Sequence, residues 1–329
     1  MRVLRAFLLV LAFAALQPAL AFEPVAVGRT QVRFATLDEA RTELARDDEW
    51  VAATSDFERA LIAKASRPVS RAEFREVMAR NAVEWTNEDV ARWRAAVEGA
   101  APRLVELRLP LPRTVTLVLI DGTQPGNVPH TRGEAIFIPR GFAMAPGADA
   151  AVMAHEFFHV SSRANPRLAS RIYGLYGFEP AAPLQWPHAW LGLNLTNPDA
   201  PQNRHALTLE HEGRTVRVMP VLVAKHTQPS PTDFIFSVLD VRLLVLAPPE
   251  PGAPSRAQLQ GTEPQWLPAY RTPAYFQRTG GNTRYLHHPE EIAADNFMLL
   301  ASGRPAPNPG LLRQLETLLR EAANQEQDK

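Results

Sequence analysis

The sequence predicts an α+β protein, in which a mainly helical N-terminal region precedes a region of short strands and a few helices. Residues 37–66 and 70–81 contain many Ala, Glu, Arg and Leu, which favour helix. Residues 114–122 and 134–141 are β-branched or apolar runs that stop at Asp-Gly, Pro or Gly turn signals. Residues 205–223 alternate in polarity around a Glu-Gly pair, which is typical of a hairpin.

The N-terminal residues predict a signal peptide, residues 1–21. Two arginines precede an apolar run, residues 6–16, and residues 19–21 offer the small-x-small pattern that signal peptidase accepts. We expect cleavage before Phe22 and a periplasmic or secreted protein. A retained anchor is the alternative, but the run is shorter than the roughly 20 residues that span a bilayer. No later stretch is long and apolar enough to do so.

Size and charge limit the classes of function. The chain has 329 residues, 46% of them hydrophobic and 21% charged, which is the balance of a soluble globular protein with a sizeable core. Lys+Arg and Asp+Glu are both 35, so no overall charge attracts nucleic acid or an anionic membrane. The absence of cysteine excludes disulfides and a lipid-modified N-terminal cysteine.

Two regions are predicted after the signal peptide. Residues 22–109 form a helical N-terminal region, which we interpret as a layer packed on the catalytic part, because amphipathic helices usually serve a core. An inhibitory or docking segment is the alternative. Residues 110–329 form the catalytic region, with a proline-rich insertion at about 180–270 that contains the hairpin. Residues 309–323 repeat leucine at helical spacing and predict a last amphipathic helix.

The stretch AVMAHEFFHV, residues 151–160, carries two histidines four residues apart, with a glutamate directly after the first. Asp149 can cap a helix that starts near Ala150, and neither Gly nor Pro interrupts the chain before Pro166. The motif therefore lies on a helix, and its apolar neighbours on several faces indicate that this helix is buried.

On that helix His155 and His159 share one face, so both imidazoles can bind one metal ion. Glu156 lies about 100° around the helix, close enough to act on a water at that ion without binding the ion. Burying three such groups without partners is costly, and a metal ion supplies the partner. The alternative is a binding or interaction module in which the histidines are ordinary core residues.

A second helix is predicted within HHPEEIAADNF, residues 287–297, where the proline suits the first turn. Glu291 and Asp295 are four residues apart and share a face of this helix. Together with the His-Glu-x-x-His motif, this pattern resembles the gluzincins, the thermolysin-like zinc metallopeptidases. The metzincin pattern is excluded, because the positions of its glycine and histidine hold Ser162 and Asn165.

The resemblance implies that His155, His159 and Glu291 bind Zn²⁺. It also implies that Asp295 accepts a hydrogen bond from a ring N–H of His155, which fixes the tautomer of this ligand. Glu290 is the rival third ligand, but no carboxylate follows it four residues later. Glu291 follows His159 at a longer interval than in thermolysin, so the intervening chain is expected to be an insertion around the cleft.

The implied reaction is hydrolysis of a peptide bond. Two neutral imidazoles and one carboxylate leave a zinc ion positively charged with an open position, which lowers the pKa of bound water towards about 7. Glu156 is the catalytic base that takes the proton of this water and passes it to the leaving nitrogen. Residues 134–139, the strand before the motif helix, are expected to bind extended substrate by their backbone edge.

Tyr285 and His288, beside His287, are candidate donors to the transition state. A tyrosine used for packing and a histidine used as a helix cap are the alternatives. The remaining histidines lack ligand spacing, and we expect them at the surface or in loops: His130, His188, His205, His211 and His226.

The sequence thus predicts an exported zinc metallopeptidase with a zincin-like fold, in which a small mixed sheet packs on the motif helix and the helix of Glu291 crosses beneath it. Its substrate is a protein, a small peptide or a peptidoglycan crosslink. The alternative is a catalytically silent zincin-like periplasmic protein that uses the metal for stability or for binding a partner. The intact Glu156 argues against this alternative, since a structural site does not need the base.

Overall fold

The computed structural model describes residues 22–122 and 126–327 and shows a mixed α+β protein, which confirms the predicted class. The predicted signal peptide, residues 1–21, lies outside the described residues. Over the part of the chain that is described, none of the helices combines the length and the hydropathy that a membrane crossing requires.

A five-stranded sheet, called the first sheet below, precedes the motif helix. Its strands lie in the order β1 (Val25–Val27), β2 (Thr30–Phe34), β3 (Thr114–Ile120), β5 (Ala135–Pro139) and β4 (His130–Arg132). β2, β3 and β5 are parallel, whereas β1 and β4 pair antiparallel at the two edges. The prediction of a helical N-terminal region missed β1 and β2, which are only three and five residues long, too short for a reliable pattern.

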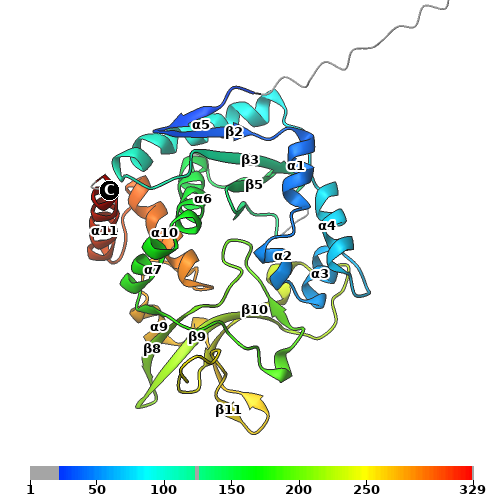
Figure 1. The fold of residues 1–329 in the computed structure, drawn as a ribbon, viewed down its shortest axis with the longest axis vertical. Coiled ribbons are helices and arrows are strands. Elements are labelled where there is room, and N and C mark those ends of the chain that lie inside the picture. The colour runs from blue at the N-terminus through cyan, green and yellow to red at the C-terminus, as the bar shows by residue number, and fades with distance from the viewer. Residues whose placement is uncertain (1–21, 123–125, 328–329) are drawn as a thin grey trace, which may run out of the picture.

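The first sheet is covered on both faces, because side chains of a strand point alternately to opposite sides. Leu117 of β3 belongs to a core with the helices α5 (Asn87–Glu106) and α6 (Asp149–Ala164). The next residue, Val118, packs in a second core with α4 (Arg71–Arg80) and its neighbours. The motif helix α6 is therefore fixed against one face of this sheet, as Figure 1 shows.

Four of the five helices of the N-terminal region form the layer over the other face, whereas α5 lies with α6 on the first face. Ser70 accepts a hydrogen bond from the backbone of Glu73, and Glu73 bonds back, so the predicted capping box at the start of α4 is confirmed. The remaining helices of this layer are α1 (Leu37–Leu44), α2 (Glu49–Ala53) and α3 (Asp56–Ile62).

A second, antiparallel sheet occupies the lower half of the molecule in Figure 1. The predicted hairpin is confirmed: β8 (His205–His211) pairs with β9 (Arg214–Ala224), and both turn residues have positive φ, 49° at Glu212 and 73° at Gly213. The other strands of this sheet are β6 (Phe178–Pro180), β7 (Asn194–Leu195), β10 (Leu239–Val245) and β13 (Trp266–Pro268).

Helix α6 begins one residue earlier than the predicted cap allows. Its N-cap is Ala148, and Asp149 is the first helical residue. The Asp149 carboxylate accepts two hydrogen bonds, of 2.7 and 2.8 Å, from Arg92 of α5. The predicted capping role of Asp149 was therefore wrong, because the carboxylate is engaged by a neighbouring helix, although it still lies in the first turn, where negative charge is favourable.

Helix α10 (Pro289–Ser302) packs directly against α6 and brings the second predicted motif to the first. Its proline occupies the first turn, as predicted, and Gly303 ends the helix with φ 63°. The elements not yet named are α7 (Pro166–Leu175), the 3-10 turn His188–Trp190, α8 (Ile235–Val238), β11 (Leu259–Gln260), β12 (Glu263–Pro264), the 3-10 turn Ala269–Arg271, α9 (Pro273–Arg278) and α11 (Pro309–Gln327).

Candidate metal centre

Three predicted ligand side chains meet where α6 and α10 pack together. Nε2 of His155 lies 3.3 Å from Oε2 of Glu291, and Nε2 of His159 lies 3.7 Å from the same oxygen. Ligand atoms of these three residues all lie within 4.8 Å of one another. With bonds of about 2.0–2.1 Å, atoms around one tetrahedral zinc ion would lie roughly 3.3 Å apart, so the spacing suits one ion.

Two of these atoms have no other partner. Nε2 of His159 and Oε2 of Glu291 are buried and make no hydrogen bond within the described residues, and both side chains are inaccessible to solvent. A buried polar atom without a partner costs free energy comparable to a lost hydrogen bond. A cation between the imidazoles and the carboxylate would offset this cost, so the residues fit a metal ion.

The second nitrogen of each imidazole contacts a carboxylate of α10. Nδ1 of His155 lies 3.2 Å from Asp295, the partner that the resemblance implied. Nδ1 of His159 lies 2.7 Å from Oε1 of Glu290. Donation from Nδ1 leaves Nε2 as the nitrogen with a free lone pair, so these contacts direct both Nε2 atoms to the shared site.

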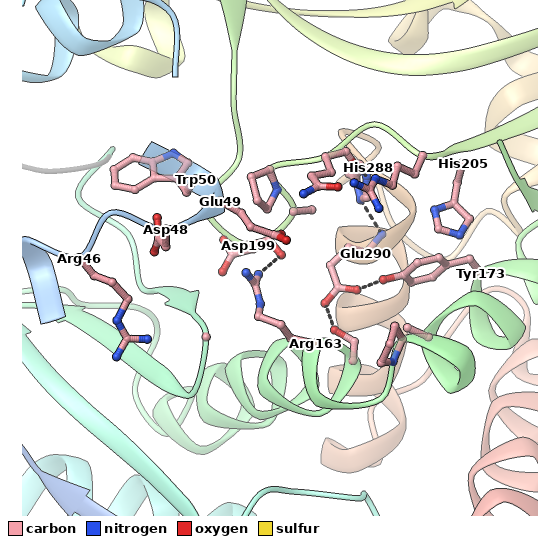
Figure 2. A pocket seen from close by; sticks show the side chains of 18 residues that line it. Arg46, Asp48, Glu49, Trp50, Arg163, Tyr173, Asp199, His205, His288 and Glu290 are labelled. Carbon is pink, nitrogen blue, oxygen red and sulfur yellow. Dashed lines mark hydrogen bonds between the residues drawn. The ribbon is translucent and has the colours of Figure 1, made fainter. Parts of the chain in front are cut away.

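Glu290 has a role that the sequence analysis missed. Besides His159, its carboxylate accepts hydrogen bonds from the hydroxyl groups of Ser162 and Tyr173; Figure 2 shows the bond from Tyr173. The rival third ligand is therefore occupied in holding His159. Its place next to Glu291 on a helix turns it about 100° away from the ligand atoms, which was the signal available in the sequence.

Glu156 lies beside the predicted ligands. Its carboxylate is 3% exposed, and Oε2 accepts a hydrogen bond of 2.9 Å from the hydroxyl of Thr131 on β4. Ligand atoms of Glu156, His159 and Asp199 also lie within 4.8 Å of one another. Neither Thr131 nor Asp199 was found from the sequence, since both reach the site only through the packing of distant segments.

At the centre, burial and neighbouring charges shift the pKa values of the side chains in opposite directions. Burial raises the pKa of Glu156, and the nearby His159 and His155 partly offset this. Burial would also raise the pKa of Glu291, but the same histidines lower it to about 2. Burial would lower the pKa of His159, but Asp199 and Glu291 raise it to about 9. The carboxylates thus attract positive charge to the imidazoles, and a metal ion would take the place of those protons.

The predicted transition-state donors differ in their surroundings. The ring of Tyr285 lies 6.2 Å from that of His155, centroid to centroid, and 4.6 Å from that of His287. Nδ1 of His288 accepts the backbone N–H of Glu290, and its Nε2 lies 3.2 Å from a backbone oxygen, so both nitrogens are used at the start of α10. This arrangement supports the helix-cap alternative for His288, whereas Tyr285 stays a candidate.

The edge strand is not the predicted one. Residues 134–139 were expected to present an open backbone edge, but β5 lies between β3 and β4, and β4 forms the edge of the sheet. The hairpin between β4 and β5 places β4 outside, which the order of residues alone does not reveal. His130 of β4 is also corrected: it is 1% exposed and stacks on Phe137 at 5.0 Å, rather than lying at the surface.

The other four histidines outside the motifs follow the expectation more closely. His188 and His226 are exposed, while His205 and His211 are half-buried. His205 contacts Ser170 through Nε2 at 3.3 Å and lines the pocket of Figure 2. Burial lowers its pKa to about 4, so it is neutral near pH 7.

A loop from the second sheet covers the centre. This covering segment, Thr196–Gln202, carries Asn197, whose side-chain amide donates to Oε1 of Glu291. It also carries Asp199, which accepts the backbone N–H of Thr131 at 2.5 Å. The sequence analysis assigned these residues to a proline-rich loop and no more, because nothing in their spacing relates them to either helix.

Two pockets flank the covering segment. The one in Figure 2 has a volume of about 460 Å³ and is lined by charged and polar groups, among them Arg163, Glu290 and His205. The other, of about 50 Å³, is lined mainly by apolar side chains of the second sheet and its loops, with Tyr285 beside them. Asp199 lines both pockets and therefore stands between them.

No family model, no curated protein and no solved structure matches the chain. The assignment of the centre therefore rests on the positions and chemistry of its own side chains. These are two imidazoles whose Nδ1 atoms each contact a carboxylate, one buried carboxylate facing them, and a second carboxylate beside the site.

Proposed function

We propose that the protein is a zinc-dependent peptidase with a gluzincin-like centre. The observation that carries the proposal is the convergence of Nε2 of His155, Nε2 of His159 and Oε2 of Glu291, of which the last two have no other partner in the described chain. Two nitrogen donors and one oxygen donor with a vacant position form the ligand set of catalytic zinc sites. The contact between Asp295 and His155 supports the same assignment.

His155, His159 and Glu291 would hold the metal ion. When bound, a zinc ion supplies Lewis-acid chemistry, polarising a carbonyl group and making water more acidic. The neighbouring carboxylate of Glu156 accepts a proton from the attacking water and returns it to the leaving nitrogen of the amide. Thr131 holds Oε2 of this carboxylate and so orients the other oxygen for proton transfer.

We propose that an extended peptide chain binds along the edge of β4. Thr131 pairs with Ile136 of β5 in the antiparallel register, yet its N–H donates away from β5, to Asp199. A sheet edge whose N–H groups point away from the sheet can pair with an extended backbone without reading its sequence. Because Thr131 also holds Glu156, a peptide at this edge would lie next to the catalytic base.

The arrangement of elements supports a zincin-like fold as part of this proposal. The motif helix α6 packs on a sheet whose edge strand is antiparallel. Helix α10 follows the second sheet in the sequence, packs against α6 and would supply the third ligand. The second sheet would then be the insertion around the cleft. The proposal also includes export through the predicted signal peptide, which suits a hydrolase that acts outside the cytoplasm.

The variant Glu156→Gln tests the proposal. We expect one zinc ion per chain in wild type and in the variant, because Glu156 is not a ligand. Peptide cleavage should fall roughly 10²- to 10⁴-fold, which is the usual contribution of general acid–base catalysis. The control is Glu179→Gln, at an exposed position of β6. Elemental analysis and digestion of a peptide library give both readouts; undiminished cleavage by Glu156→Gln would refute the mechanism.

A further inference from the structure

Contacts with Glu58 of α3 and with the proposed ligand Glu291 hold the covering segment in place. The N–H and hydroxyl of Thr196 donate to the buried carboxylate of Glu58 on α3, at 3.1 and 2.9 Å. The amide of Asn197 donates to the ligand Glu291. These contacts hold the intervening chain against the metal centre, so the position of Asp199 is set by the fold.

The Asp199 side chain faces the centre and is nine-tenths buried, with 9% of its surface exposed. Its Oδ1 accepts the N–H of Thr131, and no hydrogen bond to Oδ2 is found among the described residues. A carboxylate oxygen of Asp199 lies within 4.8 Å of a ring nitrogen of His159, whose Nε2 lacks a partner. One cation could bind both Nε2 of His159 and a carboxylate oxygen of Asp199. Asp199 is grouped with His159 and Glu156 and not with His155 and Glu291, so it would move toward these two side chains when the ion binds.

Charge favours the same arrangement. Two neutral imidazoles and the Glu291 carboxylate would leave a divalent ion with one net positive charge in a buried place. A second carboxylate, from Asp199, would make the complex neutral, and burial of a neutral complex costs less than burial of a charged one. Glu156 also lies within this distance of His159, but its Oε2 accepts a hydrogen bond from Thr131.

The contact of Asp199 with Thr131 also bears on where a peptide could bind. In an antiparallel pair, every second residue directs its N–H outward from its partner strand. Asp199 thus occupies the hydrogen-bond position on β4 that the carbonyl group of a docked peptide would take. Substrate and Asp199 cannot use this N–H together, so docking would draw the carboxylate away from the centre.

We propose that Asp199 is a displaceable fourth protein ligand, which closes the metal centre in the resting protein and leaves it when a peptide docks on β4. The inference rests on the proposed zinc peptidase function and adds its regulation. Because Asp199 lines both flanking pockets, its departure would also join the polar pocket of Figure 2 to the apolar pocket beside Tyr285. The protein would then be self-blocked until a suitable substrate competes.

Two variants of Asp199 test the proposal on the whole chain. Asp199→Asn keeps the size and the acceptor for Thr131 but is a poor metal ligand, and Asp199→Ala removes both. Each should weaken zinc binding at least about tenfold, since loss of even an outer partner of a zinc ligand costs 10- to 100-fold. The control is Asp240→Ala on β10, where the carboxylate contacts Arg242. The measurement is zinc competition against a chromophoric chelator.

A small zinc-binding probe, acetohydroxamic acid, reports whether the fourth position opens. Its affinity for the zinc-loaded variants should be higher than for wild type, about tenfold if the open state is one-tenth populated in wild type. Weaker zinc binding together with tighter probe binding is the expected pair of results. A merely structural role of Asp199 would lower zinc affinity without raising that of the probe.

The outcomes separate this inference from the proposed function. If wild type binds zinc and the Asp199 variants match Asp240→Ala in both titrations, the ligand role of Asp199 is overturned and the peptidase proposal is untouched. If the variants lose zinc affinity but wild type never binds the probe, Asp199 is a permanent ligand, which overturns displacement and supports a structural metal. If folded wild type binds no zinc, both proposals fail together.

Discussion

Each imidazole of the metal centre gives Nδ1 to a carboxylate of α10 and keeps Nε2 for the shared site. His159 is fixed more firmly than His155, since its partner Glu290 is itself held by Ser162 and Tyr173. Burial raises the pKa of Glu290, but the bonds from His159, Ser162 and Tyr173 lower it overall, so the carboxylate is ionised. An ionised acceptor strengthens the imidazole as a ligand.

The variant Glu290→Gln should therefore weaken zinc binding. We expect a loss of roughly 10- to 100-fold, because the neutral amide no longer increases the basicity of His159. Competition with a chromophoric chelator measures the affinity, and Glu179→Gln serves as the matched surface control. Equal affinities of the two variants would show that Glu290 does not act through His159.

Helix period alone places the residues His155, Glu156 and His159 correctly relative to one another. The same period, with the gluzincin resemblance, places Glu291 and Asp295 on one face of α10. It does not reveal Thr131 or Asp199, which meet Glu156 and His159 through contacts between segments far apart in the chain. Local spacing therefore predicts side chains that lie on the same helix. It misses side chains from distant segments, such as Thr131 and Asp199, that contact them.

At the level of elements, the N-terminal helices take part in building the site. Ser55, at the start of α3, donates its hydroxyl to the backbone of Asn194, and Glu58 holds Thr196. The layer that we expected to serve only as packing thus fixes the loop that covers the metal centre. Burial raises the pKa of Glu58 to about 8, and its bonds to Thr196 offset this only in part.

Glu58→Gln should change how stability depends on pH. The folded protein holds the Glu58 proton up to about pH 8, whereas the unfolded chain releases it near the ordinary value of 4.5. The folded state therefore binds more protons between these values, and its free energy of unfolding falls as pH rises through this window. Glutamine has no proton to lose, so the variant should lose less stability from pH 5 to pH 8.

Thermal melts across this pH range measure the effect, with Glu49→Gln, at an exposed position of α2, as control. Wild type and Glu49→Gln should lose stability in parallel, while Glu58→Gln follows a flatter curve. Parallel curves for all three proteins would mean that Glu58 is already ionised in the folded state.

The sequence predicts the type of an element more readily than it predicts which elements lie beside it in the fold. The β8–β9 hairpin follows from alternation and a turn pair that tolerates positive φ. The edge position of β4 does not follow, because a three-residue strand carries almost no pattern and its place depends on the turn that precedes β5. The sequence analysis therefore predicted β3 and β5 but not β4, and it took β5 for the edge at which a substrate would bind.

On the scale of the whole molecule, the candidate metal centre brings together parts of the chain that the second sheet separates in the sequence. α6 precedes this sheet in the sequence and α10 follows it, yet their side chains meet at one point. A bound ion would therefore hold the two halves of the chain together, and a protein without cysteine has no disulfide to do so.

Removal of zinc should lower thermal stability for this reason. A ligand bound only by the folded state adds about 2.7 kcal/mol at a free concentration of 100 times its Kd, which corresponds to a fall in Tm of roughly 4 °C on removal. Differential scanning calorimetry before and after chelation, with zinc loss confirmed by elemental analysis, gives the shift. An unchanged Tm in zinc-free protein would show that the centre does not tie the two segments.

The most direct test of the account is a crystal structure of tag-free protein grown with zinc, with anomalous data collected at the zinc edge. The account predicts one strong peak at about 2 Å from Nε2 of His155, Nε2 of His159 and the carboxylate of Glu291. A well-ordered structure with no peak between these three side chains, or with its zinc bound elsewhere, would contradict it.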